Sequence, residues 1–162
     1  MLKSEPFEIT LATSHSVIIP ETAARLFLND NHKRVKVRAS FNGQSISYHA
    51  ALVSKKDGSY TMYFSKEKQK QLGVFMNDYF EIQLFEDQSK YGVDMPEELD
   101  AVLTSDYEAY SIFENLTPGR QRSMIYTIKR YKSTQTRVDK ALILTNNLKR
   151  GITDPKLWLK QF

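Results

Sequence analysis

The hydrophobic pattern changes its period once along the chain, close to Tyr91 and Gly92, and this change constrains the fold more than any other feature of the sequence. Before it, apolar and polar residues alternate, as in residues 34–41, which is typical of strands with one face in a core. After it, apolar residues recur at helical spacing. The sequence therefore predicts an α+β protein with a β-rich domain at residues 1–91 and a helical region at residues 92–162.

The β-rich region contains about six predicted strands and two short predicted helices. Asn42-Gly43 is the strongest hairpin signal, because both central residues of a type I′ turn need a positive φ. Pro20 suits the first turn of one helix, and Gly73 suits the end of the other. Since many short strands would otherwise expose unpaired edges, we expect a small closed or nearly closed β-barrel. The expected strands are residues 7–12, 16–19, 34–41, 45–52, 59–64 and 79–85.

The β-rich region also matches itself at an offset of 45 residues. Residues 17–20 fall on residues 62–65, and Val35 falls on Phe80. The repeated unit would be strand, short helix, strand, and two such units imply a pseudo-symmetric closed barrel. The alternative is that ordinary alternation matches by chance, since little residue identity accompanies the match.

The helical region carries clear helix starts. Pro96 precedes two acids, Glu97 and Glu98, which suit the positive end of a helix dipole. Thr117 is a good N-cap, since a proline follows it at the first helical position. Near the C-terminus a last short turn carries Trp158 between two leucines. We expect this tail to pack against the protein, because an exposed apolar group of that size would favour aggregation.

Charge is segregated along the helical region. The chain has a net charge of +4, but residues 93–116 carry seven acids and no base, whereas residues 117–150 carry nine bases and one acid. One interpretation is that the acidic helices lie against the basic ones, or that both are simply solvated. The alternative is an anion-binding surface.

The strongest candidate for anion binding is the break between two basic helices at residues 132–135. A helix N-terminus with serine and threonine nearby favours an anion, and basic side chains surround it. The ligand could be phosphate, a lipid headgroup or nucleic acid. For Arg137 the alternative is a salt bridge to the acidic helices. The candidate anion-binding residues are Arg137, Lys132, Arg122, Lys129, Arg130 and Lys140.

Nothing in the sequence indicates catalysis. The chain has no cysteine, which excludes disulfides, thiol nucleophiles and thiolate metal sites. The glycine-rich motifs of nucleotide-binding proteins and the Gly-x-Ser-x-Gly elbow of hydrolases do not occur. We therefore predict no catalytic residue and no cofactor, and we lean towards a protein that is not an enzyme.

The candidate metal ligands also lack a recognisable pattern. The histidines are spaced evenly, 17 residues apart, which matches no metal-binding spacing, so we interpret each as an ordinary polar or capping residue. Asp94, Glu97 and Glu98 are imaginable as a carboxylate site, but acids at a helix start already have a structural explanation. We predict no metal. The three histidines are His15, His32 and His49.

The sequence favours a cytoplasmic location. Its first residues lack the apolar segment of a secretory signal, and no apolar run of about 18 residues could span a membrane. A chain without cysteine also suits a reducing compartment. The sequence does not predict the oligomeric state.

Two groups of residues resemble known bacterial families, and together they cover nearly the whole chain. The first group resembles the domain of unknown function 1905, and the second resembles the YdeI/OmpD-associated family, which is named for bacteriocin protection. The first rests on Ile18-Ile19-Pro20-Glu21, Arg34-Val35-Lys36-Val37-Arg38, Asn42-Gly43, Gly58-Ser59-Tyr60 and Leu72-Gly73. The second rests on Met95-Pro96-Glu97-Glu98-Leu99, Phe113-Glu114-Asn115-Leu116-Thr117-Pro118 and Thr136-Arg137.

The resemblance implies a barrel followed by a helical tail, in a bacterial protein associated with envelope or antimicrobial-peptide stress. It implies no established reaction. The chain departs from the first family at Asn77, where glycine is usual, and from the second at Thr127, Gln135 and Lys140, where tryptophan, glutamate and arginine are usual. A shorter likeness relates residues 66–82 to swapped-hairpin DNA-binding regulators.

Three functions follow from these observations. The first is a non-enzymatic binding or stress-associated protein whose basic helices contact an anionic partner. The second is nucleic-acid binding by the barrel or the helices, with an affinity that falls steeply as salt is added. The third is a small-ligand carrier or an unrecognised enzyme that uses the mouth of the barrel.

Overall fold

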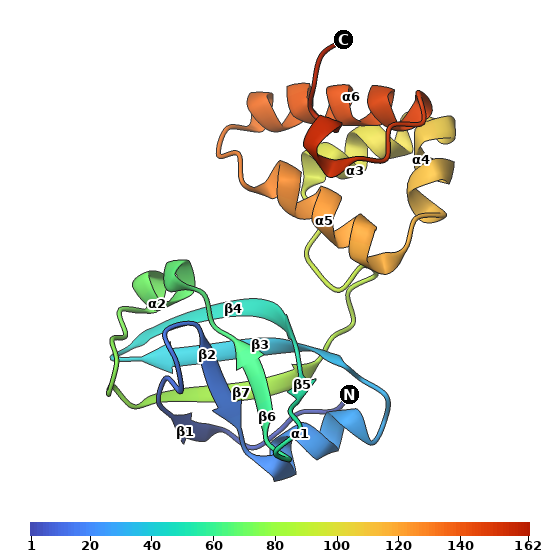
Figure 1. Ribbon diagram of the computed structural model, residues 1–162. Coiled ribbons are helices and arrows are strands. Elements are labelled where there is room, and N and C mark those ends of the chain that lie inside the picture. The colour runs from blue at the N-terminus through green and yellow to red at the C-terminus, as the bar shows by residue number, and fades with distance from the viewer. The chain divides into compact units, whose positions relative to one another are not determined.

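The computed structural model describes all residues, 1–162, and the chain divides into two compact units (Figure 1). The first unit is Met1–Gln88 and contains every strand; the second is Ser89–Phe162 and is helical. The α+β class predicted from the change in hydrophobic period is confirmed. No helix combines the length and the apolar character needed to cross a membrane.

The first unit consists of two antiparallel sheets and two short helices. One sheet has the strand order β1-β7-β3-β4 and the other has the order β2-β6-β5. The strands are β1 (Phe7–Ile9), β2 (Ser16–Ile19), β3 (Arg34–Phe41), β4 (Gln44–Ala51), β5 (Val53–Ser54), β6 (Tyr60–Tyr63) and β7 (Phe80–Glu86). The helices are α1 (Glu21–Leu28) and α2 (Lys66–Leu72).

The closed barrel expected from the sequence is not formed. Between β1 and β2 the only pairing is the isolated bridge of Leu11 with Val17, and β4 passes into β5 through Leu52. Because β1 has three residues and β5 has two, these strands pair over too short a length to make one continuous ladder. The result is two sheets that share one hydrophobic core, with seven strands instead of about six.

The predicted 45-residue repeat agrees with the order and the bounds of the elements. The segment β2-α1-β3 corresponds to β6-α2-β7, and the first residues of the two helices, Glu21 and Lys66, lie 45 positions apart. The equivalent strands pair with each other, since β2 lies against β6 and β3 against β7. In these ladders Val17 faces Met62 and Arg38 faces Gln83. In each of these two pairs, one from each ladder, the residues are one repeat of 45 positions apart. Such a pair marks a local two-fold axis, as expected of two equivalent antiparallel strands.

The second unit contains four helices and a terminal 3₁₀ turn. Side-chain oxygens of Asp106, Thr117 and Ser133 accept hydrogen bonds from backbone amides in the first turn of three of the helices. These caps explain where the helices begin. The helices are α3 (Glu97–Thr104), α4 (Tyr107–Glu114), α5 (Pro118–Lys129), α6 (Thr134–Lys149) and η1 (Pro155–Leu157).

The C-terminal tail packs into the core of the second unit, as the sequence predicts. Trp158 is 1% exposed and belongs to the same cluster as Leu99, Phe113 and Leu144. The buried amide of Asn147, on α6, holds the tail in place. Its Nδ2 atom lies 3.3, 2.8 and 2.9 Å from the carbonyl oxygens of residues 157, 158 and 160.

Candidate functional site

The turn between α5 and α6 brings several of the predicted anion-binding residues together. Arg130 and Lys140 both lie over the ring of Tyr131, with the guanidinium carbon 5.1 Å and the ammonium nitrogen 5.5 Å from its centre. Arg130 also donates a hydrogen bond of 3.1 Å to the phenol oxygen. Lys132 is exposed in the same turn. We name Arg130, Tyr131, Lys132 and Lys140 the basic turn.

None of the three cations of the basic turn forms an ion pair with a carboxylate. The turn also precedes the N-terminus of α6, where the helix dipole adds a positive partial charge. Ser133 uses its hydroxyl to cap this helix by accepting from the amide of Thr136. The basic turn is therefore a place where positive charge gathers with no carboxylate to neutralise it.

Arg137, the first candidate from the sequence, is used inside the fold. Its Nε donates to the carbonyl oxygen of Tyr131 at 2.6 Å, and a terminal nitrogen donates to that of Lys129 at 3.0 Å. Its other terminal nitrogen lies 3.6 Å from a carboxylate oxygen of Glu98. The guanidinium thus satisfies carbonyls that the end of α5 would leave unpaired. For Arg137 the salt bridge that the sequence left open is the arrangement found.

The remaining two candidates take different positions. Lys129 is half-buried at the last position of α5, one residue before the basic turn. Arg122 is half-buried and lies eight residues before Arg130 on the same stretch of helix, which separates them by roughly 12 Å along the axis at 1.5 Å per residue. Arg122 is therefore not part of the basic turn.

Acidic and basic helices do meet at two points. Besides Arg137 and Glu98, Lys149 at the end of α6 lies 2.7 Å from the carboxylate of Asp106, the N-cap of α4. The hydrogen bond from Lys149, with that from the amide of Ala109, lowers the pKa of Asp106. Part of the segregated charge is therefore neutralised within the second unit.

A second polar group in this unit has a structural role. The phenol of Tyr91 and the ammonium of Lys90 both donate to the same carboxylate oxygen of Glu114, and Lys90 also donates to Tyr110 at 3.1 Å. Hydrogen bonding from Tyr91 lowers the pKa of Glu114, while burial, followed by the contact with Glu114, raises the pKa of Tyr91 to about 12. Tyr91 stays protonated at neutral pH and cannot act as a base.

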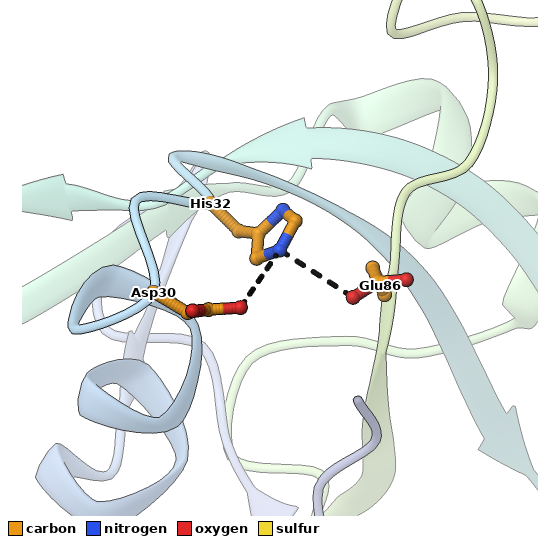
Figure 2. A group of neighbouring side chains, drawn as sticks. All are labelled: Asp30, His32 and Glu86. Atoms are coloured by element: carbon orange, nitrogen blue, oxygen red, sulfur yellow. Dashed lines mark ion pairs between the residues drawn. The ribbon is translucent and has the colours of Figure 1, made fainter. Parts of the chain in front are cut away.

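In the first unit, the histidines lie in three separate surroundings. His15 stacks on Tyr63, with ring centres 6.0 Å apart, and His49 lies 3.4 Å from the carboxylate of Asp87. His32 lies between two carboxylates, 3.3 Å from Asp30 and 3.4 Å from Glu86, as Figure 2 shows. Their even spacing along the chain therefore has no structural counterpart.

The group of Asp30, His32 and Glu86 is the only set of three nitrogen or carboxylate ligands that the structure brings to one point. In the sequence His32 has the character of an ordinary polar residue, and no local pattern connects it with Glu86, which is 54 positions away. The local pattern Asp30-x-His32, directly after a helix, was the signal available. The acids considered from the sequence, Asp94, Glu97 and Glu98, do not form such a group.

Two open grooves lie on the surface, one in each unit. A groove of about 500 Å³ runs beside residues 3–7, Pro20 and Leu26 in the first unit, and one of about 290 Å³ lies between α6 and residues 160–162 in the second. Neither groove gathers a nucleophile with a base. The hypothesis of a small-ligand carrier placed the ligand in the mouth of a closed barrel. Because the strands form two separate sheets, that binding site is not formed.

Comparison with known proteins gives two family matches. Residues 92–151 match the family described as bacteriocin-protection, YdeI or OmpD-associated, and residues 7–84 match the domain of unknown function DUF1905. No curated protein matches the chain. The structure is similar to the solution structure of PHS018 from Pyrococcus horikoshii, with 14% sequence identity, a TM-score of 0.39, and coverage of 52% of this chain and 95% of that one. Two different family models therefore match the two parts of the chain, the DUF1905 model in the first unit and the bacteriocin-protection, YdeI or OmpD-associated model in the second.

Proposed function

We propose that this protein is a non-enzymatic binding protein whose basic turn holds a phosphate group of an anionic partner. The observation that carries the proposal is that Arg130 and Lys140 meet over the ring of Tyr131, with the exposed Lys132 next in the chain, and that no carboxylate neutralises these three cations. A phosphate accepts several charge-assisted hydrogen bonds at once and would compensate them. The positive partial charge at the N-terminus of α6 also favours a negatively charged ligand.

Arg137 has a positioning role in this proposal. It ties the last carbonyls of α5 to α6 and so fixes the angle at which Arg130 and Lys140 approach Tyr131. It is therefore not expected to contact the ligand. Lys129 lies close enough to contribute to the local positive potential. Arg122 belongs to a different part of α5.

The arrangement favours a phosphate group over a stacked base. In proteins that bind single-stranded nucleic acids, bases stack on free aromatic faces. The ring of Tyr131 already contacts two cations, Arg130 and Lys140, and a nucleic-acid base would have to compete with them for the ring faces. A lipid headgroup or free phosphate would make the same contacts with the three cations, and a lipid headgroup agrees with the envelope association implied by the family name.

The test is binding by the full chain to three probes: inorganic phosphate, vesicles containing phosphatidylglycerol, and single-stranded DNA. The triple variant Arg130→Ala, Lys132→Ala, Lys140→Ala is expected to lose about tenfold or more in affinity for the probe that binds. The matched control removes three exposed lysines of the first unit, Lys55, Lys56 and Lys70, with the same change in net charge.

Each outcome decides the proposal. Binding of vesicles, with weakening by the first triple variant and not by the control, supports a lipid headgroup; the same pattern with phosphate alone supports a free anion. Equal weakening by both triple variants would show that only net charge matters. That result would overturn the basic turn as a site, as would failure of all three probes to bind at low salt.

A further inference from the structure

We propose that Asp30, His32 and Glu86 form a binding site for a divalent transition metal ion of the Zn²⁺ type. This site lies in the first unit and does not depend on the function proposed for the second. The three residues offer one imidazole nitrogen and two carboxylate oxygens, all within 4.8 Å of one another. Such a mixed set suits Zn²⁺ and similar ions, whereas Mg²⁺ and Ca²⁺ prefer oxygen alone.

The end of α1 positions two of the three ligands. The backbone amide of His32 donates to the carbonyl oxygen of Phe27 at 2.9 Å, and the amide of Asp30 donates to the same oxygen at 3.1 Å. Asn31, between them, has a positive φ of 61°. The chain therefore folds back sharply after the helix, and this turn brings the side chains of residues 30 and 32 to one side.

Strand pairing supplies the third ligand. Glu86 is the last residue of β7 and faces Val35, near the start of β3, in the antiparallel ladder. Its amide donates to the carbonyl oxygen of Leu2 at 2.8 Å, which anchors it from the other side. Because β3 begins two residues after His32, this register places Glu86 beside the imidazole.

The distances agree with coordination of a single ion. In Figure 2 both carboxylates point towards the same nitrogen, Nε2 of His32, at 3.3 and 3.4 Å. Two ligands of a tetrahedral zinc ion, each about 2.0–2.2 Å from the metal, are roughly 3.3–3.6 Å apart. The two nitrogen-to-oxygen distances therefore already have the required length. The carboxylate oxygens need to approach each other by at most roughly 1.5 Å, and the exposed side chain of Asp30 can make this movement.

The charges of these side chains also favour a divalent cation. Two carboxylates directed at one imidazole carry two negative charges, and a protonated histidine neutralises only one of them. A divalent cation would compensate both while the imidazole binds in its neutral form. Asp30 is 68% exposed, so the site opens to solvent, and three protein ligands leave a coordination position for water.

The first experiment adds ZnCl₂ to the full chain after treatment with a chelator. Titration calorimetry is expected to show one ion per chain, and thermal unfolding is expected to shift upwards by several degrees, because the ion binds only the folded arrangement. Co²⁺ should give the visible absorption of a low-coordinate site. Mg²⁺ at the same concentration should produce neither the heat nor the shift.

Variants locate the site. His32→Ala is expected to lower the Zn²⁺ affinity by at least about tenfold, while Glu86→Gln and Asp30→Asn keep the shape of each side chain and weaken binding less strongly. His15→Ala removes an exposed imidazole elsewhere in the same unit and should leave the affinity unchanged. If His32→Ala fails to fold, the two amide variants still report on the site.

Two results would overturn the proposal. One is the absence of Zn²⁺ binding at millimolar concentration in the wild-type chain. The other is an affinity that survives in Glu86→Gln and Asp30→Asn but falls in His15→Ala, which would place the ion elsewhere. Loss of metal binding leaves anion binding by the second unit untouched, so failure of one proposal is distinguishable from failure of the other.

Discussion

The two units of this protein gather charges of opposite sign. In the first unit, the carboxylates of Asp30 and Glu86 meet at a single imidazole. In the second, Arg137 and Lys149 each find a carboxylate, but the basic turn between α5 and α6 does not. The proposed cation site and the proposed anion site are thus each built from the geometry of a single unit.

The largest expected effect is a loss of stability when Arg137, a cation of the second unit with partners inside the fold, is removed. Arg137→Ala leaves the carbonyls of Lys129 and Tyr131 and the half-buried carboxylate of Glu98 without their partner. We expect the second unit to lose about 2–3 kcal/mol of unfolding free energy, measured by urea denaturation. Arg137→Lys should recover only part of this, because an ammonium cannot reproduce the planar contacts.

Lys132→Ala is the control for that comparison. It removes a cation of the basic turn that has no partner, so the unfolding free energy should change by less than about 0.5 kcal/mol. If both variants destabilise the protein equally, the distinction between a structural arginine and available cations is wrong.

A smaller effect tests whether the ring of Tyr131 organises the basic turn. Tyr131→Phe keeps the face on which Arg130 and Lys140 lie and removes only the hydroxyl that accepts from Arg130. Its affinity for the anionic probe should change by less than about threefold, whereas Tyr131→Leu should weaken it by about fivefold, since both cation–π contacts are lost. Similar affinities for the two variants would show that the ring is not needed.

The unfolding free energy should depend on pH through those acids of the second unit that are neutralised inside the fold, such as Glu114. Because the pKa of Glu114 is lowered in the folded state, this residue stabilises folding above its ordinary pKa of 4.5, and the contribution disappears as the pH falls through the lower folded value. The group is partly exposed, so the contribution is less than about 1 kcal/mol. Unfolding free energies measured between pH 6 and about pH 3 should fall less steeply in Glu114→Gln.

The smallest expected effect concerns an exposed ion pair that belongs to neither binding point. Arg25 lies 2.7 Å from Glu21, one turn earlier on α1, and both side chains are more than half exposed. Glu21→Gln should change the stability of the first unit by about 0.5 kcal/mol or less. A larger loss, seen in thermal unfolding, would mean that pairing at the surface matters as much as pairing at the helix ends.

Local features of the fold were predictable from the sequence. Asn42 and Gly43 both have a positive φ, as a type I′ hairpin requires, and Gly73 ends α2 in the left-handed conformation. Thr117 caps α5, followed by a proline in the first turn. The division of the strands into two sheets, in place of the expected closed barrel, was not predictable, because alternation shows which face of a strand is buried but not which strand lies beside it.

The same distinction applies to the candidate sites. The residues of the basic turn lie within eleven positions, so their clustering is visible in the sequence. Glu86 reaches His32 only through the register of β3 with β7, which no local pattern reveals. For Arg137 the sequence offered the salt bridge to the acidic helices, but not its two hydrogen bonds to backbone carbonyls, which no residue type in a pattern can show.

The two-fold pairing of the repeated segments has a consequence for how the chain acquires its structure. Since β2 pairs with β6 and β3 with β7, neither strand–helix–strand segment can complete a sheet until the other has been synthesised. The first unit therefore depends on contacts between distant parts of the chain, which slow folding, whereas the hydrogen bonds within each helix of the second unit join near neighbours. After dilution from denaturant, helical signal from the second unit should return before the protected amides of β3 and β7.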